Sequence, residues 1–137
     1  CSSESIKRYQ NRISGPLLDR IDLHIDVPPL KAEDLQDTQT VENSETVRQR
    51  VIAAYQLQIQ RQGFLNQALS TQQLERYAHL DDASAKILAL AQQRLNLSAR
   101  AYHRVLRVAR TIADLAQCQN IESSHLTEAL SYRGQEH

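Results

Sequence analysis

The chain has 137 residues, of which 16 are basic and 16 acidic, so its formal net charge is zero at pH 7. Hydrophobic residues make up 41% of the sequence and aromatic residues only 4%, while glycine and proline occur three times each. These values fit one domain, or one domain with an appendage, whose aliphatic core comes from packed helices, and they exclude nucleic-acid binding through global charge.

The beginning of the sequence is predicted to form short elements. Residues 1–12 fit a short polar helix that Ser2 or Ser3 caps. Residues 14–16, Ser-Gly-Pro, interrupt this helix, and residues 17–20 have room for one further turn at most.

A strand and a linker are predicted next. Residues 21–27 alternate apolar and polar side chains with a period of two, which is typical of a strand, and Pro28-Pro29 stops it. Because the rest of the chain offers no sheet, we expect this segment to be disordered or to lie as an exposed edge. Residues 30–43 are polar, include four acidic side chains and are predicted to be a linker.

From Ser44 onward the pattern is helical. Ser44 fits an N-cap and Gly63 a C-terminal stop for a first helix. One face of that helix carries Val47, Val51, Ala54, Tyr55 and Ile59. Later helices are predicted to begin at the polar caps Ser70, Asp81 or Asp82, Ser98 and Ser123. A buried stripe is predicted for Leu80, Ser84, Ile87, Ala91 and Leu95, and inward-facing residues in the last helix are Leu126, Ala129 and Leu130. Short connections predict a compact bundle over residues 44–137.

The helix predicted for residues 99–117 has two distinct faces. Its apolar face comprises Tyr102, Val105, Leu106, Ala109, Ile112, Ala113 and Ala116. The opposite face carries Arg100, Arg104, Arg107 and Arg110, which we call the arginine stripe. Such a stripe is usually a solvated surface, but a phosphate-facing surface or a contact with an acidic neighbour also fits it.

Two arginines stand out by position. Arg20 lies at the junction between a helical turn and the predicted strand, where a long cation suits an anion or an acidic partner. Arg100 lies in the first turn of its helix, where the helix dipole disfavours a cation by about 0.3–1 kcal/mol. A nearby anion would explain its presence, because the free N–H groups attract the same anion; an ordinary solvated arginine is the alternative.

Other chemistry is sparse. Asp22, His24 and Asp26 share one face of the predicted strand and fit either a metal or acid–base site or simply a polar face. Cys1 and Cys118 form neither a zinc framework nor a disulfide scaffold, and we expect a reduced, cytoplasmic location. No phosphate loop and no strand ending in paired acids occurs, so this chain alone is not expected to hydrolyse a nucleotide.

Two segments resemble a known family. Residues 8–28 read RYQNRISGPLLDRIDLHIDVP, and residues 97–115 read LSARAYHRVLRVARTIADL. The first is similar to the segment after sensor 1, and the second to the sensor 2 helix, of magnesium-chelatase-like AAA+ ATPases, a family that includes bacterial competence proteins. The resemblance covers most of residues 6–133.

The resemblance implies roles for the two arginines. Arg20 would be an arginine finger that reaches the nucleotide of a neighbouring subunit, and Arg100 would be the sensor 2 residue that contacts an ATP phosphate. Residues 1–29 would end the ATPase core, and residues 44–137 would be its helical lid. The chain starts with cysteine and lacks methionine, so we expect it to be part of a longer protein.

The resemblance implies that this longer protein binds ATP and Mg²⁺, forms a homo-oligomeric ring, expected to be a hexamer, and acts on DNA during recombination. The isolated chain is expected to bind no cofactor and no membrane. Two alternatives stay open: a free-standing helical module that binds DNA or an acidic protein through the arginine stripe, and a magnesium chelatase subunit that acts on a porphyrin.

Overall fold

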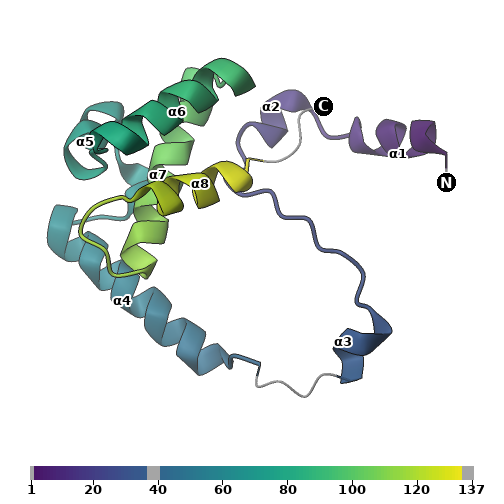
Figure 1. Cartoon of the computed structure of the whole chain (residues 1–137), viewed down its shortest axis with the longest axis horizontal. Helices are drawn as coiled ribbons and strands as arrows, with labels where there is room; N and C mark the ends of the chain where they lie inside the picture. The colour runs from purple at the N-terminus through teal and green to yellow at the C-terminus, as the bar shows by residue number, and fades with distance from the viewer. Residues whose placement is uncertain (1, 37–40, 134–137) are drawn as a thin grey trace.

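The computed structural model describes residues 2–36 and 41–133. Helices α4 to α8 form a compact body, which we call the bundle, and residues 2–36 form an arm beside it (Figure 1). The predicted, mainly helical fold class is confirmed. No helix in the described part of the chain has the length and apolar character that a membrane crossing requires.

The elements follow one another in a simple order. The arm carries α1 (Ser3–Gln10), α2 (Gly15–Leu18) and α3 (Ala32–Gln36). The bundle comprises α4 (Ser44–Gln62), the 3₁₀ turn η1 (Asn66–Ala68), α5 (Thr71–Tyr77), α6 (Asp82–Leu95), α7 (Ala99–Leu115) and α8 (Ser123–Ser131).

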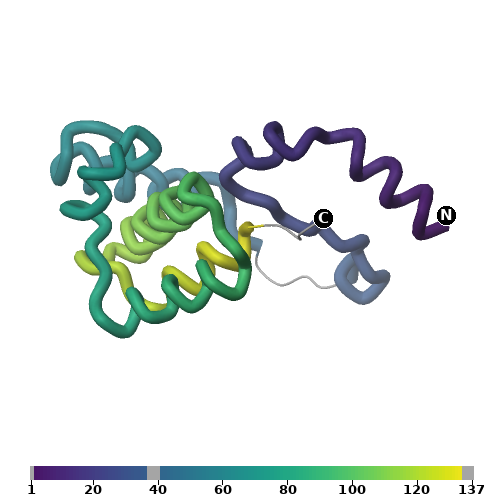
Figure 2. Tube along the Cα trace, turned by 90° about the horizontal axis from the view of Figure 1, so that it is seen from above, coloured from purple at the N-terminus to yellow at the C-terminus, as the bar shows by residue number. Residues whose placement is uncertain are grey.

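Helix α7 is the centre of the bundle. It packs against α8, α4, α5 and η1, while α6 packs against α8; Figure 2 shows this body apart from most of the arm. The predicted apolar face of α7 supplies Val105, Leu106, Ala109 and Ala113 to the core. The other elements contribute Leu69, Leu74, Ala78, Leu88, Ile121, Leu126 and Ala129. Aliphatic side chains therefore hold the bundle together, as the composition predicted.

Most helix starts in the bundle follow the predicted caps. Ser70 forms a reciprocal capping box with Gln73, and the Ser98 hydroxyl accepts a hydrogen bond from the Ala101 N–H (3.1 Å). Gly63 ends α4 with a positive φ of 85°, a conformation that glycine adopts without strain. Two caps differ by one residue from prediction: Asn43 caps α4 and Glu122 caps α8.

The N-terminal cap of α6 predicts a pH dependence of thermal stability that can be tested. Asp81 accepts a hydrogen bond from the Ser84 N–H (2.7 Å), and this bond places the pKa of Asp81 below its ordinary value. The cap therefore contributes its full stability above the ordinary aspartate pKa, and that contribution is lost as the pH falls through the lowered pKa. We expect Asp81→Asn, which keeps a neutral cap, to lose less thermal stability than the unmodified chain between pH 6 and pH 3. Identical losses in thermal scans would contradict this.

The arm departs from the predicted secondary structure. Its first helix is as expected. The single turn predicted for residues 17–20 forms instead at Gly15–Leu18, because Ser14 caps it and Pro16 fits its first turn. The strand predicted for residues 21–27 is wrong, because this segment has irregular backbone. A strand needs a neighbouring strand that pairs with it along its length, and residues 21–27 have none in the described structure. The predicted linker, residues 30–43, contains the short helix α3; its residues 37–40 lie outside the described part.

Helix α4 also buries less than its pattern predicted. Of the apolar face predicted from Val47 to Ile59, only Ala54 is buried, and the other four side chains are exposed. For Val47 and Val51 the reason is visible in Figure 1, because the first half of α4 extends beyond α7. Tyr55 and Ile59 lie in the second half, where Ala54 and Gln58 are the buried residues of α4. The stripe predicted in α6 is correct, since Ser84 is buried and the remaining members are half-buried.

Candidate functional site

The segment that carries Arg20 is a capped turn. The Ser14 hydroxyl accepts a hydrogen bond from the Leu17 N–H (3.3 Å), and Pro16 lies in the first turn of α2, where its missing N–H has no cost. The Arg20 N–H then donates to the Leu17 carbonyl (3.1 Å), which fixes the backbone directly after α2. The Arg20 side chain is exposed, with no hydrogen bond or ion pair to any described residue.

Arg100 is the second residue of α7. Its first turn contains no acidic side chain, and the Ser98 hydroxyl satisfies only the Ala101 N–H. The start of α7 therefore keeps a positive potential from the helix dipole and from its free N–H groups, to which Arg100 adds a full charge. The exposed Arg100 side chain also has no partner among the described residues. This end of α7 can attract a multiply charged anion.

The arginine stripe is not a solvated surface, which corrects the usual interpretation. Arg107 donates to the Leu69 carbonyl through Nε (3.0 Å) and Nη2 (2.9 Å). Arg110 is 3% exposed and donates to the carbonyls of Cys118 (2.9 Å) and Gln119 (3.0 Å). These arginines donate hydrogen bonds to backbone carbonyls of the loops beside α7. One guanidinium can bind more than one carbonyl, since it has five donors.

Arg104 is the third arginine of the stripe that has a partner. Its Nε lies 3.4 Å from Oδ1 of Asp22 in the arm. Of the four arginines of the stripe, Arg100 alone has no hydrogen-bond or ion-pair partner within residues 2–36 and 41–133. The fold therefore uses three of these side chains and leaves one available for a ligand.

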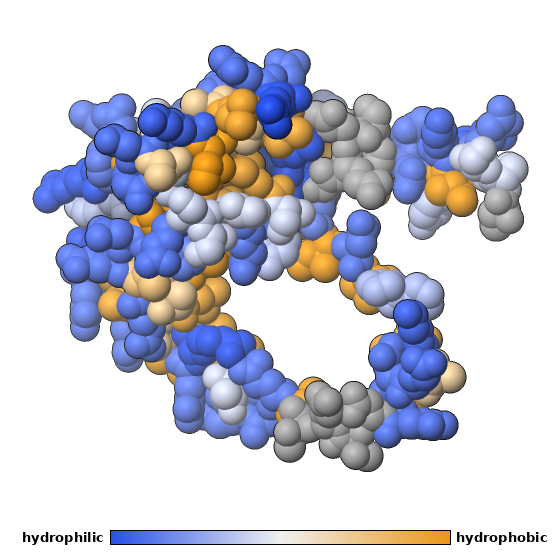
Figure 3. Space-filling view, viewed as in Figure 1, coloured by the Kyte–Doolittle hydropathy of each residue, from blue (hydrophilic) through white to orange (hydrophobic). Residues whose placement is uncertain are grey.

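A wide groove lies between the arm and the bundle. Its volume is about 1230 Å³. The residues on either side of Arg20, Asp19 and Ile21, line it from the arm. Ser98 and Ala101, which flank the start of α7, line it from the bundle. In the space-filling view, open space separates much of the arm from the bundle (Figure 3). The two singled-out arginines thus lie at the borders of one groove, although neither lines it.

The comparison with protein families identifies the chain. The sequence model described as magnesium chelatase, subunit ChlI C-terminal, matches residues 41–133. The chain belongs to the magnesium chelatase ChlI family. A second model of this family, described as subunit ChlI, matches residues 1–35. Residues 36–40, inside the predicted linker, separate the two matches.

Curated relatives in the ChlI family are considerably longer than this chain. The competence protein ComM of Haemophilus influenzae is 47% identical over 133 residues, which cover 96% of this chain and 26% of that protein. The uncharacterized protein YifB of Escherichia coli K12 is 43% identical, with 97% and 26% covered. An uncharacterized protein of Mycobacterium tuberculosis is 36% identical, with 97% and 27% covered. The chain spans about a quarter of the length of these relatives.

The ChlI-family bundle also contains a buried charged network that the sequence did not predict. Asp114 is 1% exposed and lies between two arginines. Its Oδ1 accepts from Arg61 Nη1 (2.7 Å) and lies 3.1 Å from Arg110 Nη2, and its Oδ2 accepts from Asn66 Nδ2 (2.9 Å). Burial lowers the pKa of Arg110, and the Asp114 charge opposes that shift. The available signal was an aspartate on the face of α7 that carries the arginine stripe, four residues after Arg110.

The histidine and aspartates of residues 22–26 do not form a shared site. Asp22 pairs with Arg104, while the His24 ring nitrogen Nε2 lies 3.2 Å from the Ile21 carbonyl. Asp26 is exposed and has no described partner. Among the described residues these three side chains do not form a group of potential metal ligands, and the polar-face interpretation of their pattern is retained.

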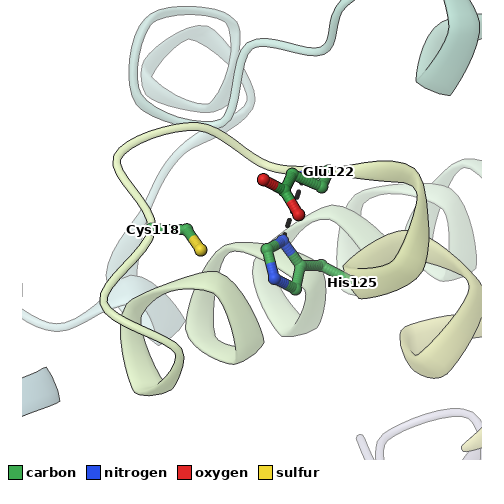
Figure 4. Close-up of side chains that lie close together, drawn as sticks. All are labelled: Cys118, Glu122 and His125. Atoms are coloured by element: carbon green, nitrogen blue, oxygen red, sulfur yellow. Dashed lines mark hydrogen bonds between the residues drawn. The ribbon is translucent and has the colours of Figure 1, made fainter.

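One cluster has the composition of a metal site. Potential ligand atoms of Cys118, Glu122 and His125 lie within 4.8 Å of one another at the start of α8 (Figure 4). However, the Glu122 N–H donates to Nδ1 of His125 (3.0 Å), so a neutral ring carries its proton on Nε2. A metal at Nδ1 would displace this capping bond. We therefore interpret the cluster as part of the α8 cap.

Proposed function

We propose that the chain is the C-terminal part of an AAA+ motor, comprising the end of the ATPase core and the helical lid. Arg20 would act in trans as the arginine finger, and Arg100 would act in cis as sensor 2. The observation that carries this proposal is that Arg100 is available to bind a ligand. The other three arginines of the stripe are bound within the fold.

The start of α7 fits a phosphate group and not a metal ion. It offers N–H dipoles and the Arg100 guanidinium, with no carboxylate in the first turn. Arg100 would hold a phosphate oxygen of ATP bound by the upstream core, and that core would supply Mg²⁺ coordination. A guanidinium on the phosphates stabilises the charge that develops as the terminal phosphoryl group leaves.

The exposed apolar side chains of the arm support the proposal that an ATPase core packs against the arm. Large apolar residues of the arm expose between 41% and 87% of their surface, which is an unusually apolar surface for a free segment. They are Ile6, Tyr9, Ile13, Leu17, Ile21, Leu23, Ile25, Val27, Leu30 and Leu35. An ATPase core preceding the arm would cover them and would offer residues 21–27 a sheet to join.

We propose DNA as the substrate of the motor. The name of the Haemophilus influenzae relative places that protein in competence, and competence involves the handling of DNA. A magnesium chelatase subunit is the second candidate, favoured by the family description. A free-standing DNA-binding module receives less support, because the stripe that would bind DNA is occupied by internal contacts.

The test is ATP hydrolysis by the full-length protein, a ring assembly in this proposal, with and without DNA. We expect DNA to stimulate hydrolysis and Arg100→Ala to lower the rate about 10²-fold, as the loss of one preorganised cation does. Arg94→Ala, an exposed arginine near the end of α6, is the matched control. Stimulation by a porphyrin and Mg²⁺ instead of DNA would favour the chelatase, and unchanged turnover in Arg100→Ala would reject the sensor 2 role.

A further inference from the structure

The arm meets the bundle at a restricted area. Within residues 2–36, Leu18 and His24 are the half-buried residues, and all other described side chains of the arm are exposed. Both lie within four residues of Arg20. The part of the arm that carries Arg20 is therefore the part that the bundle holds.

Two polar contacts make this connection. Asp22 Oδ1 lies 3.4 Å from Nε of Arg104, whose side chain is 14% exposed, against 67% for Asp22. The His24 N–H donates to the carbonyl of Tyr132 (2.8 Å), directly after α8. A cavity of only about 10 Å³ lies between Asp22 and the surface of α7 and α8. The arm thus rests directly on these helices.

The spacing of these residues connects the two singled-out arginines. Asp22 follows Arg20 by two residues, and Arg104 follows Arg100 by four residues, which is about one helical turn. Since α7 is a continuous helix, a displacement of Arg100 along or around the helix axis also displaces Arg104. The ion pair then transmits that displacement to a segment of irregular backbone, which has few other contacts to resist it.

We infer that the Asp22–Arg104 ion pair, with the His24–Tyr132 hydrogen bond, is a link that positions Arg20 according to the position of α7. This inference rests on the proposed function. When Arg100 of a subunit contacts ATP, the position of α7 in that subunit would set the position of its Arg20. This Arg20 is the finger that reaches the neighbouring subunit. Asp22 and Arg104 are positioning residues, because they act through Arg20 and do not touch the nucleotide.

The experiment measures ATP hydrolysis by the full-length protein with Asp22→Asn, Arg104→Gln and the exchange Asp22→Arg/Arg104→Asp. We expect each single variant to lower kcat about 5- to 20-fold with KM for ATP within about twofold, and the exchange to restore most of kcat. Asp26→Asn, an exposed aspartate of the same segment without a described partner, should leave kcat unchanged. Thermal unfolding of Asp22→Asn should shift little, because Asp22 is largely exposed and such groups contribute little stability through ion pairs.

The outcomes separate this link from the proposed function. If Arg20→Ala and Arg100→Ala abolish hydrolysis but Asp22→Asn leaves kcat unchanged, the link is rejected and the motor assignment stands. If the single variants lower kcat and the charge exchange does not restore it, the ion pair is likewise rejected as the link. If Arg20→Ala itself leaves hydrolysis unchanged, the finger assignment fails and the link fails with it.

Discussion

Replacing Arg20 by alanine in the full-length protein should lower the rate of ATP hydrolysis by about 10³-fold. The side chain is exposed and has no described partner within its own chain, so the loss should come from the transition state and not from the fold. A finger supplied by a neighbour stabilises the charge on the transferring phosphoryl group but contributes little to ground-state binding. The affinity for a fluorescent ATP analogue should therefore stay within about threefold.

Mixing subunits tests whether Arg20 acts across an interface. In the proposed function, a site would need Arg100 of its own subunit and Arg20 of the neighbour, so Arg20→Ala and Arg100→Ala subunits should be complementary. When they assemble at random in equal amounts, about one quarter of the interfaces in a ring contain both wild-type arginines. Hydrolysis should recover to about that fraction of the wild-type rate. No recovery in verified mixed rings would mean that both arginines serve the same subunit.

Arg48 provides the matched control for this prediction. It is an exposed arginine on α4 without a described partner, in the first half of the helix that extends beyond α7. Arg48→Ala should leave hydrolysis within about twofold of wild type, as expected for a surface position away from the site. A comparable loss in Arg48→Ala would show that a general reduction in positive charge, and not the position of Arg20, determines the rate.

Replacing Asp114 by alanine should destabilise the chain by about 3–5 kcal/mol. The carboxylate is 1% exposed and is the shared partner of Arg61, Arg110 and Asn66. Removing it leaves Arg110, itself 3% exposed, as a buried cation without its counter-charge. It also removes polar contacts of α4 and η1 with α7, because Arg61 and Asn66 both donate to Asp114.

Urea unfolding followed by circular dichroism would measure this loss. Glu75→Ala, an exposed acid on α5 with no described partner, is the control and should change the free energy of unfolding by less than about 0.5 kcal/mol. Asp114→Asn keeps the shape and one acceptor, so it should cost less than the alanine variant. A loss below about 1 kcal/mol in Asp114→Ala would mean that water or rearranged carbonyls compensate the buried arginines.

Local sequence signals predicted the helical part of this protein well. The Ser70, Asp81 and Ser98 caps, the glycine at position 63 and the apolar face of α7 each depend on residues within one or two turns. Such features act through nearby hydrogen bonds and helical periodicity, and the structure reproduces them. The two motifs around Arg20 and Arg100 likewise led to the family that the comparisons show, while the roles of these arginines remain predictions.

The failures share one physical origin. Residues 21–27 have the alternation of a strand but no neighbouring strand in the described structure, and Val47 to Ile59 have an apolar face but no helix to cover most of it. In both cases the side-chain pattern requires a partner that the described part of this chain does not provide. The surroundings of an element, and not its own pattern, decide whether its hydrogen bonds and apolar surface are satisfied.

The sequence by itself determined where the helices of the bundle lie, which face of α7 is apolar and which arginines occupy notable positions. Only the tertiary structure decided how those arginines differ. Arg107 binds the carbonyl of Leu69, which is distant in sequence, and Arg110 binds carbonyls of the loop that follows α7. Arg104 contacts Asp22 of the arm, and Arg100 stays available. The sequence pattern of a helix does not show which of its arginines will be paired. The acceptors for these guanidinium groups lie in other segments, and only folding brings them close.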